Sequence, residues 1–366
     1  MNMLNKIIDA GSVREFAEWV DRYQKFVILG HTSPDGDAVG STLALYHYLT
    51  SKGKQAQVVM PNVFPDFLRW LPGSSNVAFY HNASRNPRNV ERVRQLMGEA
   101  EVICCLDFNV LSRIDEIESL VRASSAKILL LDHHLHPGDF ADITISHPEQ
   151  SSTCELLFRF LWDLGHYDDM TEAEAACLYT GMMTDTGGFT YNSVRSEIFY
   201  IVGLLLQKGI DKDVIYRKVN NNFTSARLHL QGTVLSRMVH LPEYHSAILT
   251  LSKSEQQSLD YHRGDSEGFV NLPLGIKDVI FSCFLRENTD RDEIKLSFRS
   301  VGSFSCREVA AHFGGGGHLN ASGAECPGIS MEEAKKRVVE VLAKYKDELE
   351  RCYREEIRRP YVVRKS

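Results

Sequence analysis

The sequence contains no apolar run that approaches the roughly 18 residues needed to cross a bilayer. Its first ten residues include Asn5, Lys6 and Asp9, and they lack the continuous apolar segment of a secretory signal peptide. These absences argue against a transmembrane helix and against secretion. We therefore expect a cytoplasmic protein that has no membrane partner.

The sequence also has no Cys-x-x-Cys pair, although it contains eight cysteines. Cys104 and Cys105 lie in a strand-like apolar run, and Cys154, Cys177 and Cys283 have apolar neighbours. Structural zinc sites and disulfide frameworks need regularly spaced cysteines. We therefore expect reduced thiols inside the core, with neither a disulfide framework nor a zinc ribbon.

An excess of positive charge is missing as well. The 41 lysines and arginines are outnumbered by 48 aspartates and glutamates, and the formal net charge is −7. Proteins that clamp long nucleic acid are usually basic, because their affinity comes from neutralising backbone phosphates. Any phosphate recognition here must be local, which favours a short substrate over a long duplex. Composition leaves the oligomeric state open, a homodimer included.

The 366 residues suggest two domains. In the first half, short apolar runs alternate with segments of helical periodicity, which is typical of a parallel sheet covered on both faces. The expected strands are 25–30, 55–60, 101–107 and 127–132, and the expected helices are 37–53, 152–165, 171–184 and 196–209. This pattern predicts an N-terminal α/β domain over residues 1–208.

The pattern changes after a polar, asparagine-rich stretch, and we expect a connector over residues 209–228. A smaller C-terminal α/β domain should follow over residues 229–346. Its expected elements are strands 247–251, 279–285 and 294–298 and a closing helix at 331–345. Charge is dense in residues 347–366, which we interpret as a frayed surface tail.

Acidic and histidine side chains recur where the N-terminal strands and helices end. They are His31, Asp35, Asp37, Asp107, Asp132, His133, His134 and Asp185. Ligands of open parallel sheets bind outside the carboxyl ends of the strands, so these residues should converge. Taken singly, each has a plainer explanation as a turn, a helix cap or a core histidine. Together, and in this order, they predict a metal site.

Several aspartates in one crevice need counter-charge, which divalent cations supply. Carboxylates combined with imidazoles favour Mn²⁺, with Mg²⁺ or Fe²⁺ as alternatives. Two ions would suit phosphoryl hydrolysis. Asp107 stands alone after its strand and is the natural bridging carboxylate.

A second candidate region is the segment FGGGGHLNASG over residues 313–323. Successive glycines expose backbone N–H groups and let an anion approach closely, although most glycine runs are simply hinges. We expect substrate contacts from Gly314, Gly315, Gly316, Gly317, His318, Ser322 and, on a neighbouring strand, Arg299. Ser152 could contact phosphate but is better explained as a helix cap.

These motifs resemble those of the DHH phosphoesterase superfamily. The triplet Asp132-His133-His134 stands with HTSPDGDAVGS, CLDFN and MTDTGG, and GGGGHLNASG is similar to the motif of the DHH-associated C-terminal domain. Length and motif order resemble the NrnA-type branch, whose members degrade short oligoribonucleotides and dephosphorylate pAp. The resemblance implies an active site in a cleft between the two domains.

The resemblance also implies a role for each residue. One ion would be held by His31, Asp35 and Asp107, and the other by Asp37, Asp107, His133 and Asp185. His134 would act on the scissile phosphate or its leaving oxygen, and Asp132 would orient the histidines. The implied reaction is metal-dependent hydrolysis of oligoribonucleotides of about two to five residues and of pAp. Alternatives are a cyclic or linear dinucleotide phosphodiesterase, a polyphosphatase or pyrophosphatase, and a catalytically silent nucleotide-binding regulator.

Overall fold

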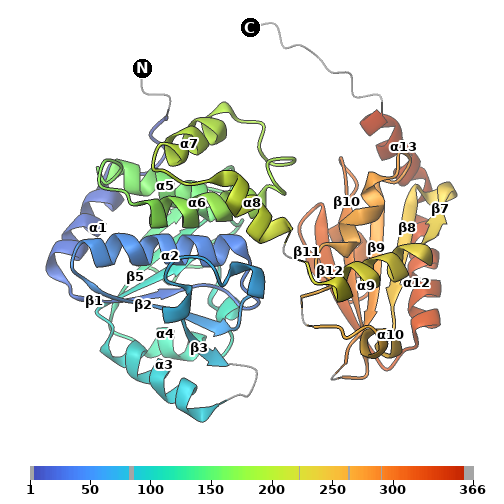
Figure 1. Cartoon of the computed structure of the whole chain (residues 1–366), viewed down its shortest axis with the longest axis horizontal. Helices are drawn as coiled ribbons and strands as arrows, with labels where there is room; N and C mark the ends of the chain where they lie inside the picture. Colours follow the sequence, from blue (N-terminus) through green and yellow to red (C-terminus); the bar gives the residue numbers. More distant parts are fainter. Residues whose placement is uncertain (1–3, 82–85, 222, 263, 290, 358–366) are drawn as a thin grey trace, which may run out of the picture. The chain divides into compact units, whose positions relative to one another are not determined.

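The computed structural model describes residues 4–81, 86–221, 223–262, 264–289 and 291–357. The chain divides into two units, Met1–Asn222 and Phe223–Ser366, each with its own core (Figure 1). The division lies inside the expected connector. Within the described ranges, every helix is too short or too polar to span a bilayer.

Unit 1 is built on a six-stranded parallel sheet in the order β3-β2-β1-β4-β5-β6. The strands are β1 Lys25–Leu29, β2 Gln55–Asn62, β3 Ala78–His81, β4 Val102–Leu106, β5 Lys127–Asp132 and β6 Ile143–Ser146. This is a doubly wound order, in which the chain changes direction across the sheet between β1 and β4. The expected parallel sheet is therefore confirmed, and it has two additional strands, β3 and β6.

Helices cover both faces of this sheet, as the sequence predicts. They are α1 Ala10–Arg22, α2 Gly36–Ser51, α3 Pro87–Glu99, α4 Ile117–Ala123, α5 Thr153–Asp163, α6 Glu172–Asp185, α7 Ser196–Leu206 and α8 Lys212–Asn220. Successive β1 residues point to opposite faces. Ile28 joins the core under α1, α2, α5, α6 and α7, whereas Val27 and Leu29 join the core under α3 and α4. Burial on both faces explains why the strands read as continuous apolar runs.

Local signals fix the ends of two helices next to the site. Thr171 and Glu174 form a reciprocal capping box at the start of α6. The Ser152 hydroxyl accepts the backbone N–H of Glu155 at 3.0 Å, so Ser152 caps α5, which was the preferred interpretation. These caps determine where α5 and α6 begin.

Unit 2 contains a mixed sheet in the order β11-β12-β10-β9-β8-β7, with one parallel pair, β8 and β9. Its strands are β7 Val239–Leu241, β8 Ser246–Leu251, β9 Phe281–Glu287, β10 Glu293–Ser300, β11 Gly316–Gly317 and β12 Ala321–Pro327. Its helices are α9 Ser225–Ser236, α10 Lys253–Ser258, α11 Cys306–Ala311, α12 Met331–Lys344 and α13 Lys346–Ile357. The smaller α/β domain predicted from the sequence is thus present.

Two segments differ from the expectation of irregular structure. The expected connector contains α8 and the start of α9, and the expected frayed tail contains α13. In α8, Ile215 and Val219 are four residues apart and both buried, and in α13 the buried Leu349 and Cys352 are three residues apart. A sparse apolar stripe is sufficient once a neighbouring element covers it.

All eight cysteines are buried free thiols, as expected. Burial raises the pKa of Cys306 to about 11. These side chains therefore act as core residues.

Candidate metal centre

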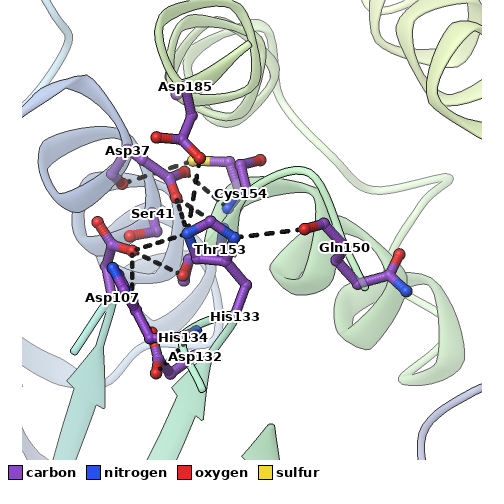
Figure 2. A network of polar contacts seen from close by, with 12 residues as sticks. Asp37, Ser41, Asp107, Asp132, His133, His134, Gln150, Thr153, Cys154 and Asp185 are labelled. Atoms are coloured by element: carbon purple, nitrogen blue, oxygen red, sulfur yellow. Dashed lines mark hydrogen bonds and ion pairs between the residues drawn. The ribbon is translucent and has the colours of Figure 1, made fainter. Parts of the chain in front are cut away.

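The expected ligands of unit 1 gather at the carboxyl edge of its parallel sheet. Figure 2 shows five of them close together, namely Asp37, Asp107, His133, His134 and Asp185. His31 lies two residues after β1, Asp107 directly follows β4, and Asp132 is the last residue of β5. The strand order reverses between β1 and β4, which is where doubly wound sheets form their ligand crevice.

Asp107 is the centre of this cluster. Its Oδ2 lies 3.4 Å from His31 Nε2, and its Oδ1 lies 3.7 Å from His133 Nε2. The hydroxyl of Thr153 donates to the same Oδ1 at 2.9 Å. The side chain is almost completely buried, and the backbone adopts a φ of 64°, which a non-glycine residue rarely does. One carboxylate therefore faces imidazoles on two sides.

The ring orientation of His31 is set by the chain itself. Its Nδ1 lies 2.7 Å from the carbonyl oxygen of Thr32, which can only accept a hydrogen bond. The proton is therefore on Nδ1, and Nε2 presents a lone pair toward Asp107 and toward Asp35, whose Oδ1 is 3.9 Å away. Burial lowers the pKa of His31, which favours the neutral ring that a metal ligand must be.

Asp37 is held by the N-terminus of α5. The backbone N–H groups of Thr153 and Cys154 donate to its two carboxylate oxygens, at 2.6 and 2.9 Å. A helix N-terminus stabilises negative charge through such N–H groups. The fit is tight, because a Cβ added at Gly181 would lie 2.8 Å from Asp37 Oδ1 and 2.2 Å from Cys154 Sγ.

Asp35 and Asp185 complete the acidic groups and come from helix ends. Asp35 caps α2, because its Oδ1 accepts the backbone N–H groups of Asp37 and Ala38 at 3.0 and 3.1 Å. Asp185 is the last residue of α6, and its Oδ2 lies 3.5 Å from His133 Nε2. Both side chains are more exposed than Asp37 and Asp107.

The two adjacent histidines use their rings differently. His133 directs Nδ1 at the carbonyl oxygen of Gln150, 3.3 Å away, and turns Nε2 toward three carboxylates. His134 directs Nδ1 at Asp132 Oδ1, 2.7 Å away, and its backbone N–H donates to Asp132 Oδ2 at 3.0 Å. The first arrangement is suited to a metal ligand and the second to a proton donor steadied by a buried carboxylate.

Three groups of side chains place their ligand atoms within 4.8 Å of one another. One is His31, Asp35 and Asp107, and another is Asp37, His133 and Asp185. The third is Asp107 with His133 and His134, so His134 also stands near enough to be a ligand. Oxygen and imidazole donors without cysteine suit Mn²⁺, Fe²⁺ or Mg²⁺ better than structural zinc.

The buried carboxylates of this cluster also need a cation to balance their charge. Burial, followed by the charges of Asp37, Asp35, Asp185 and Asp132, raises the pKa of Asp107 well above its usual range. Burial likewise raises the pKa of Asp37 and of Asp185. Carboxylates this close and this buried cannot all stay ionised unless positive charge compensates them. The residues present therefore fit a divalent-metal centre.

The residues that orient the ligands were not predicted from the sequence. Thr153 contacts both Asp37 and Asp107, Cys154 contacts Asp37, and the Gln150 carbonyl orients His133. One signal was available, since a Ser152 cap implies that the following N–H groups open a helix. The sequence did not show that this helix points at Asp37.

The expected substrate residues lie in unit 2. Gly316 and Gly317 form β11, which pairs with Gly323 and Ser322 of β12. Arg299, on β10, pairs with Ala321 on the other side of β12. His318 is exposed, whereas Ser322 is buried.

The glycines of this run are not equivalent. A Cβ at Gly315 would lie 2.1 Å from the carbonyl oxygen of Gly323. Close packing against β12 is therefore sufficient to explain why this residue is a glycine. Gly314 has a φ of 71°. By contrast, a Cβ at Gly316 would meet no atom within 4 Å.

Comparison with known proteins agrees with this architecture. Residues 25–182 match the model of the DHH family, N-terminal domain, and residues 246–345 match the DHHA1 domain. A solved structure from Bacteroides fragilis, described as an exopolyphosphatase-related protein, is 53% identical. It aligns over 95% of this chain and 100% of its own, with a TM-score of 0.91.

The chain belongs to the DHH family. Members of this family hydrolyse phosphoester bonds, and the chain is a phosphoester hydrolase with a DHH and a DHHA1 domain. The DHH match lies within unit 1 and the DHHA1 match within unit 2. The metal cluster lies in unit 1, with Asp185 three residues beyond the end of the DHH match.

Two curated DHH-family relatives carry specific names. The bifunctional oligoribonuclease and PAP phosphatase NrnA of Thermus thermophilus is 28% identical over 86% of this chain and 88% of its own length. The cyclic-di-AMP phosphodiesterase PdeA of Listeria monocytogenes is 23% identical over 90% of this chain but only 49% of its own length.

Proposed function

We propose that this protein hydrolyses short oligoribonucleotides to mononucleotides and removes a phosphate from pAp, using two divalent cations, with Mn²⁺ preferred. The observation that carries the proposal is that two carboxylate–imidazole groups meet at a single buried carboxylate, Asp107. The NrnA relative, which aligns over most of both chains, supports the choice of substrate.

The metal-binding roles follow from the ring and carboxylate orientations. His31, Asp35 and Asp107 would hold one ion, and Asp37, His133 and Asp185, with Asp107 shared, would hold the other. Bound cations would supply Lewis-acid stabilisation of phosphate charge and a hydroxide formed from water at neutral pH. Thr153 and the N-terminus of α5 would keep Asp37 and Asp107 in position.

His134 and Asp132 would manage the leaving group. The buried Asp132 carboxylate accepts a hydrogen bond from His134 Nδ1 and would hold the ring in place. His134 Nε2 would then donate a proton to the departing ribose oxygen. In unit 2, we propose that Arg299, His318, Ser322 and the glycines 314–317 bind substrate phosphate.

The decisive experiment compares substrates at equal enzyme concentration with Mn²⁺, Mg²⁺ and Fe²⁺ in turn. The substrates are pAp, a linear dinucleotide, a four-residue oligoribonucleotide, cyclic di-AMP, pyrophosphate and a short polyphosphate. We expect pAp and the oligoribonucleotides to be turned over best. The Asp107→Asn variant provides the inactive control, since it keeps the volume of the side chain and removes its charge.

A cyclic-dinucleotide phosphodiesterase is the second candidate, because the PdeA relative aligns over 90% of this chain. If cyclic di-AMP is hydrolysed in preference to pAp, the protein is a cyclic-dinucleotide phosphodiesterase and the first proposal is wrong. Preference for polyphosphate would instead match the description of the Bacteroides fragilis protein.

A further inference from the structure

Unit 1 contains a pocket outside the metal cluster that combines cations with an indole ring. It has a volume of about 470 Å³ and is lined by Asp66, Arg69, Trp70, Val214, Arg217 and Lys218. The residues come from η1 (Asp66–Leu68) with the turn after it, and from α8. Three cations face one carboxylate here, in a chain whose net charge is −7.

Two contacts connect the segments that carry this pocket to segments that carry metal ligands. Asn62, the last residue of β2, accepts the backbone N–H of Ser33 at 2.7 Å, and η1 begins four residues later. Tyr216 lies within 3.8 Å of a Cβ built on Gly188, three residues after Asp185. η1 therefore follows a strand that contacts the chain just after His31, and α8 lies near the chain just after Asp185.

The cations of this pocket differ in how they are compensated. Arg69 donates its Nε–H to Asp66 Oδ1 at 2.5 Å. Among the described residues, Arg217 and Lys218 have no carboxylate oxygen within 4.0 Å, and Lys218 Nζ instead lies 5.4 Å from the centroid of the Trp70 ring. The charge of Arg217 also helps to lower the pKa of Asp213, after the larger effect of Lys212, so Arg217 is only partly compensated. Arg217 and Lys218 can therefore both turn toward an anion beside the Trp70 indole.

A plainer explanation covers part of this arrangement. Cations in the last turn of a helix interact favourably with its dipole, and Arg217 and Lys218 are in the last turn of α8. That effect explains the helix position but not the convergence with Arg69 and Trp70 in a hollow. Cations interleaved with aromatic rings are the usual surface for single-stranded nucleic acid.

We propose that this pocket binds the phosphate of a nucleotide beyond the scissile bond, in oligoribonucleotides of three or more residues. The inference rests on the proposed function and extends it to substrate length. Since pAp has no such nucleotide, the pocket would assist the hydrolysis of oligoribonucleotides without assisting the hydrolysis of pAp. The recognised group is a phosphodiester, and the Trp70 ring in the same pocket is available for the adjoining base.

The test is the Arg217→Ala/Lys218→Ala double variant with a four-residue oligoribonucleotide and with pAp. We expect KM for the tetranucleotide to rise on the order of tenfold, and KM for pAp to stay the same. The slope of log(kcat/KM) against log salt should become shallower by about 0.7, because the variant loses one phosphate contact and each such contact to a single strand contributes about 0.7. Tetranucleotide binding in EDTA, measured by fluorescence anisotropy, should weaken by the same factor.

The chain offers a matched control at the other edge of the sheet. A pocket of about 360 Å³ is lined by Gly11, Arg14, Glu15, Glu18, Trp19, Arg22, Tyr23 and Lys127. Arg22 ends α1 three residues before β1 begins, so it lies at the amino edge, away from the metal cluster. The Arg14→Ala/Arg22→Ala variant removes the same charge and should change neither KM nor the salt slope.

Each outcome has a separate meaning. An equal decrease in kcat/KM for pAp and for the tetranucleotide would overturn the proposal. It would mean that the pocket binds an unrelated anion or only supports folding. Behaviour identical to the control variant would overturn it as well. If the wild-type protein hydrolyses phosphoesters but no oligoribonucleotide, the proposed function fails, while the binding measurement in EDTA still tests the pocket.

Discussion

Asp132 Oδ1 lies 2.7 Å from His134 Nδ1, so a completely buried carboxylate fixes the imidazole beside the metal cluster. The same carboxylate also accepts the backbone N–H of His134. This double contact sets both the tautomer and the direction of the ring. It distinguishes His134 from its neighbour His133, whose Nδ1 is oriented by a backbone carbonyl.

The two histidines should therefore respond differently to mutation. His134→Ala should keep most of the bound metal and slow turnover by about 10²–10⁴, as expected when an acid–base group is lost. His133→Ala should instead lose metal, because its Nε2 faces Asp37, Asp107 and Asp185. Metal content by elemental analysis, together with kcat, separates the two. Similar metal loss in both variants would show that His134 is a ligand, consistent with its grouping with Asp107.

Thr153 should support the metal centre without touching the substrate. Thr153→Val keeps the shape of the side chain and removes the hydroxyl that donates to Asp107 Oδ1. We expect metal affinity to fall roughly 10–100-fold, the usual cost of losing a group that orients a ligand. Thr153→Ser restores the hydroxyl and should recover most of the affinity. Calorimetric titration with Mn²⁺ is the measurement, and equal affinity in all three proteins would contradict this role.

The metal-free protein should lose stability as pH rises. Burial and mutual repulsion raise the pKa of Asp37, Asp107 and Asp185 in the folded chain, whereas an unfolded aspartate titrates near 3.9. The folded state therefore binds more protons than the unfolded state, and this stability is full below the unfolded pKa and declines as pH rises through the folded values. Divalent cations should reverse the trend, because metal binding displaces protons.

Thermal unfolding in EDTA between pH 5 and 8 tests this, with Asp107→Asn as the comparison. The variant has no carboxyl group to titrate at that position. Its Tm should therefore increase relative to the Tm of the wild type as pH increases. With saturating Mn²⁺, the Tm of the wild type should instead increase relative to that of the variant as pH increases. A difference in Tm that does not change with pH in EDTA would contradict the account of Asp107.

The glycine-rich run of unit 2 can be tested without disturbing its packing. Because a Cβ at Gly315 would collide with β12, a Gly315→Val change cannot separate binding from folding. His318→Ala and Gly316→Ala avoid that problem, since His318 and Gly316 are exposed and a Cβ at Gly316 meets no atom within 4 Å.

For His318→Ala, a lost hydrogen bond to a charged group, about 1.5–3 kcal/mol, predicts a tenfold to hundredfold rise in KM for pAp. Gly316→Ala should raise KM less, by blocking close approach to the backbone. A small chromogenic phosphoester should be affected less than pAp in both variants. Equal losses on both substrates would show that the run is a hinge or packing feature.

The sequence by itself determined which residues of unit 1 belong to the cluster. Each of the eight stands at or beside the end of a strand or helix, and the carboxyl ends of parallel strands share one edge. The continuous apolar strands likewise determined that the sheet is covered on both faces. These inferences rest on periodicity and chain direction, which are local properties of the sequence.

Only the tertiary structure decided how the cluster is held and what lies around it. Thr153 is 116 residues from Asp37 and 46 from Asp107, and no local pattern connects them. The tautomers of His31 and His133 depend on carbonyl oxygens that fold beside them. The pocket formed by Trp70 and Lys218 joins two segments almost 150 positions apart. Such contacts follow from packing between distant elements, which sequence spacing does not encode.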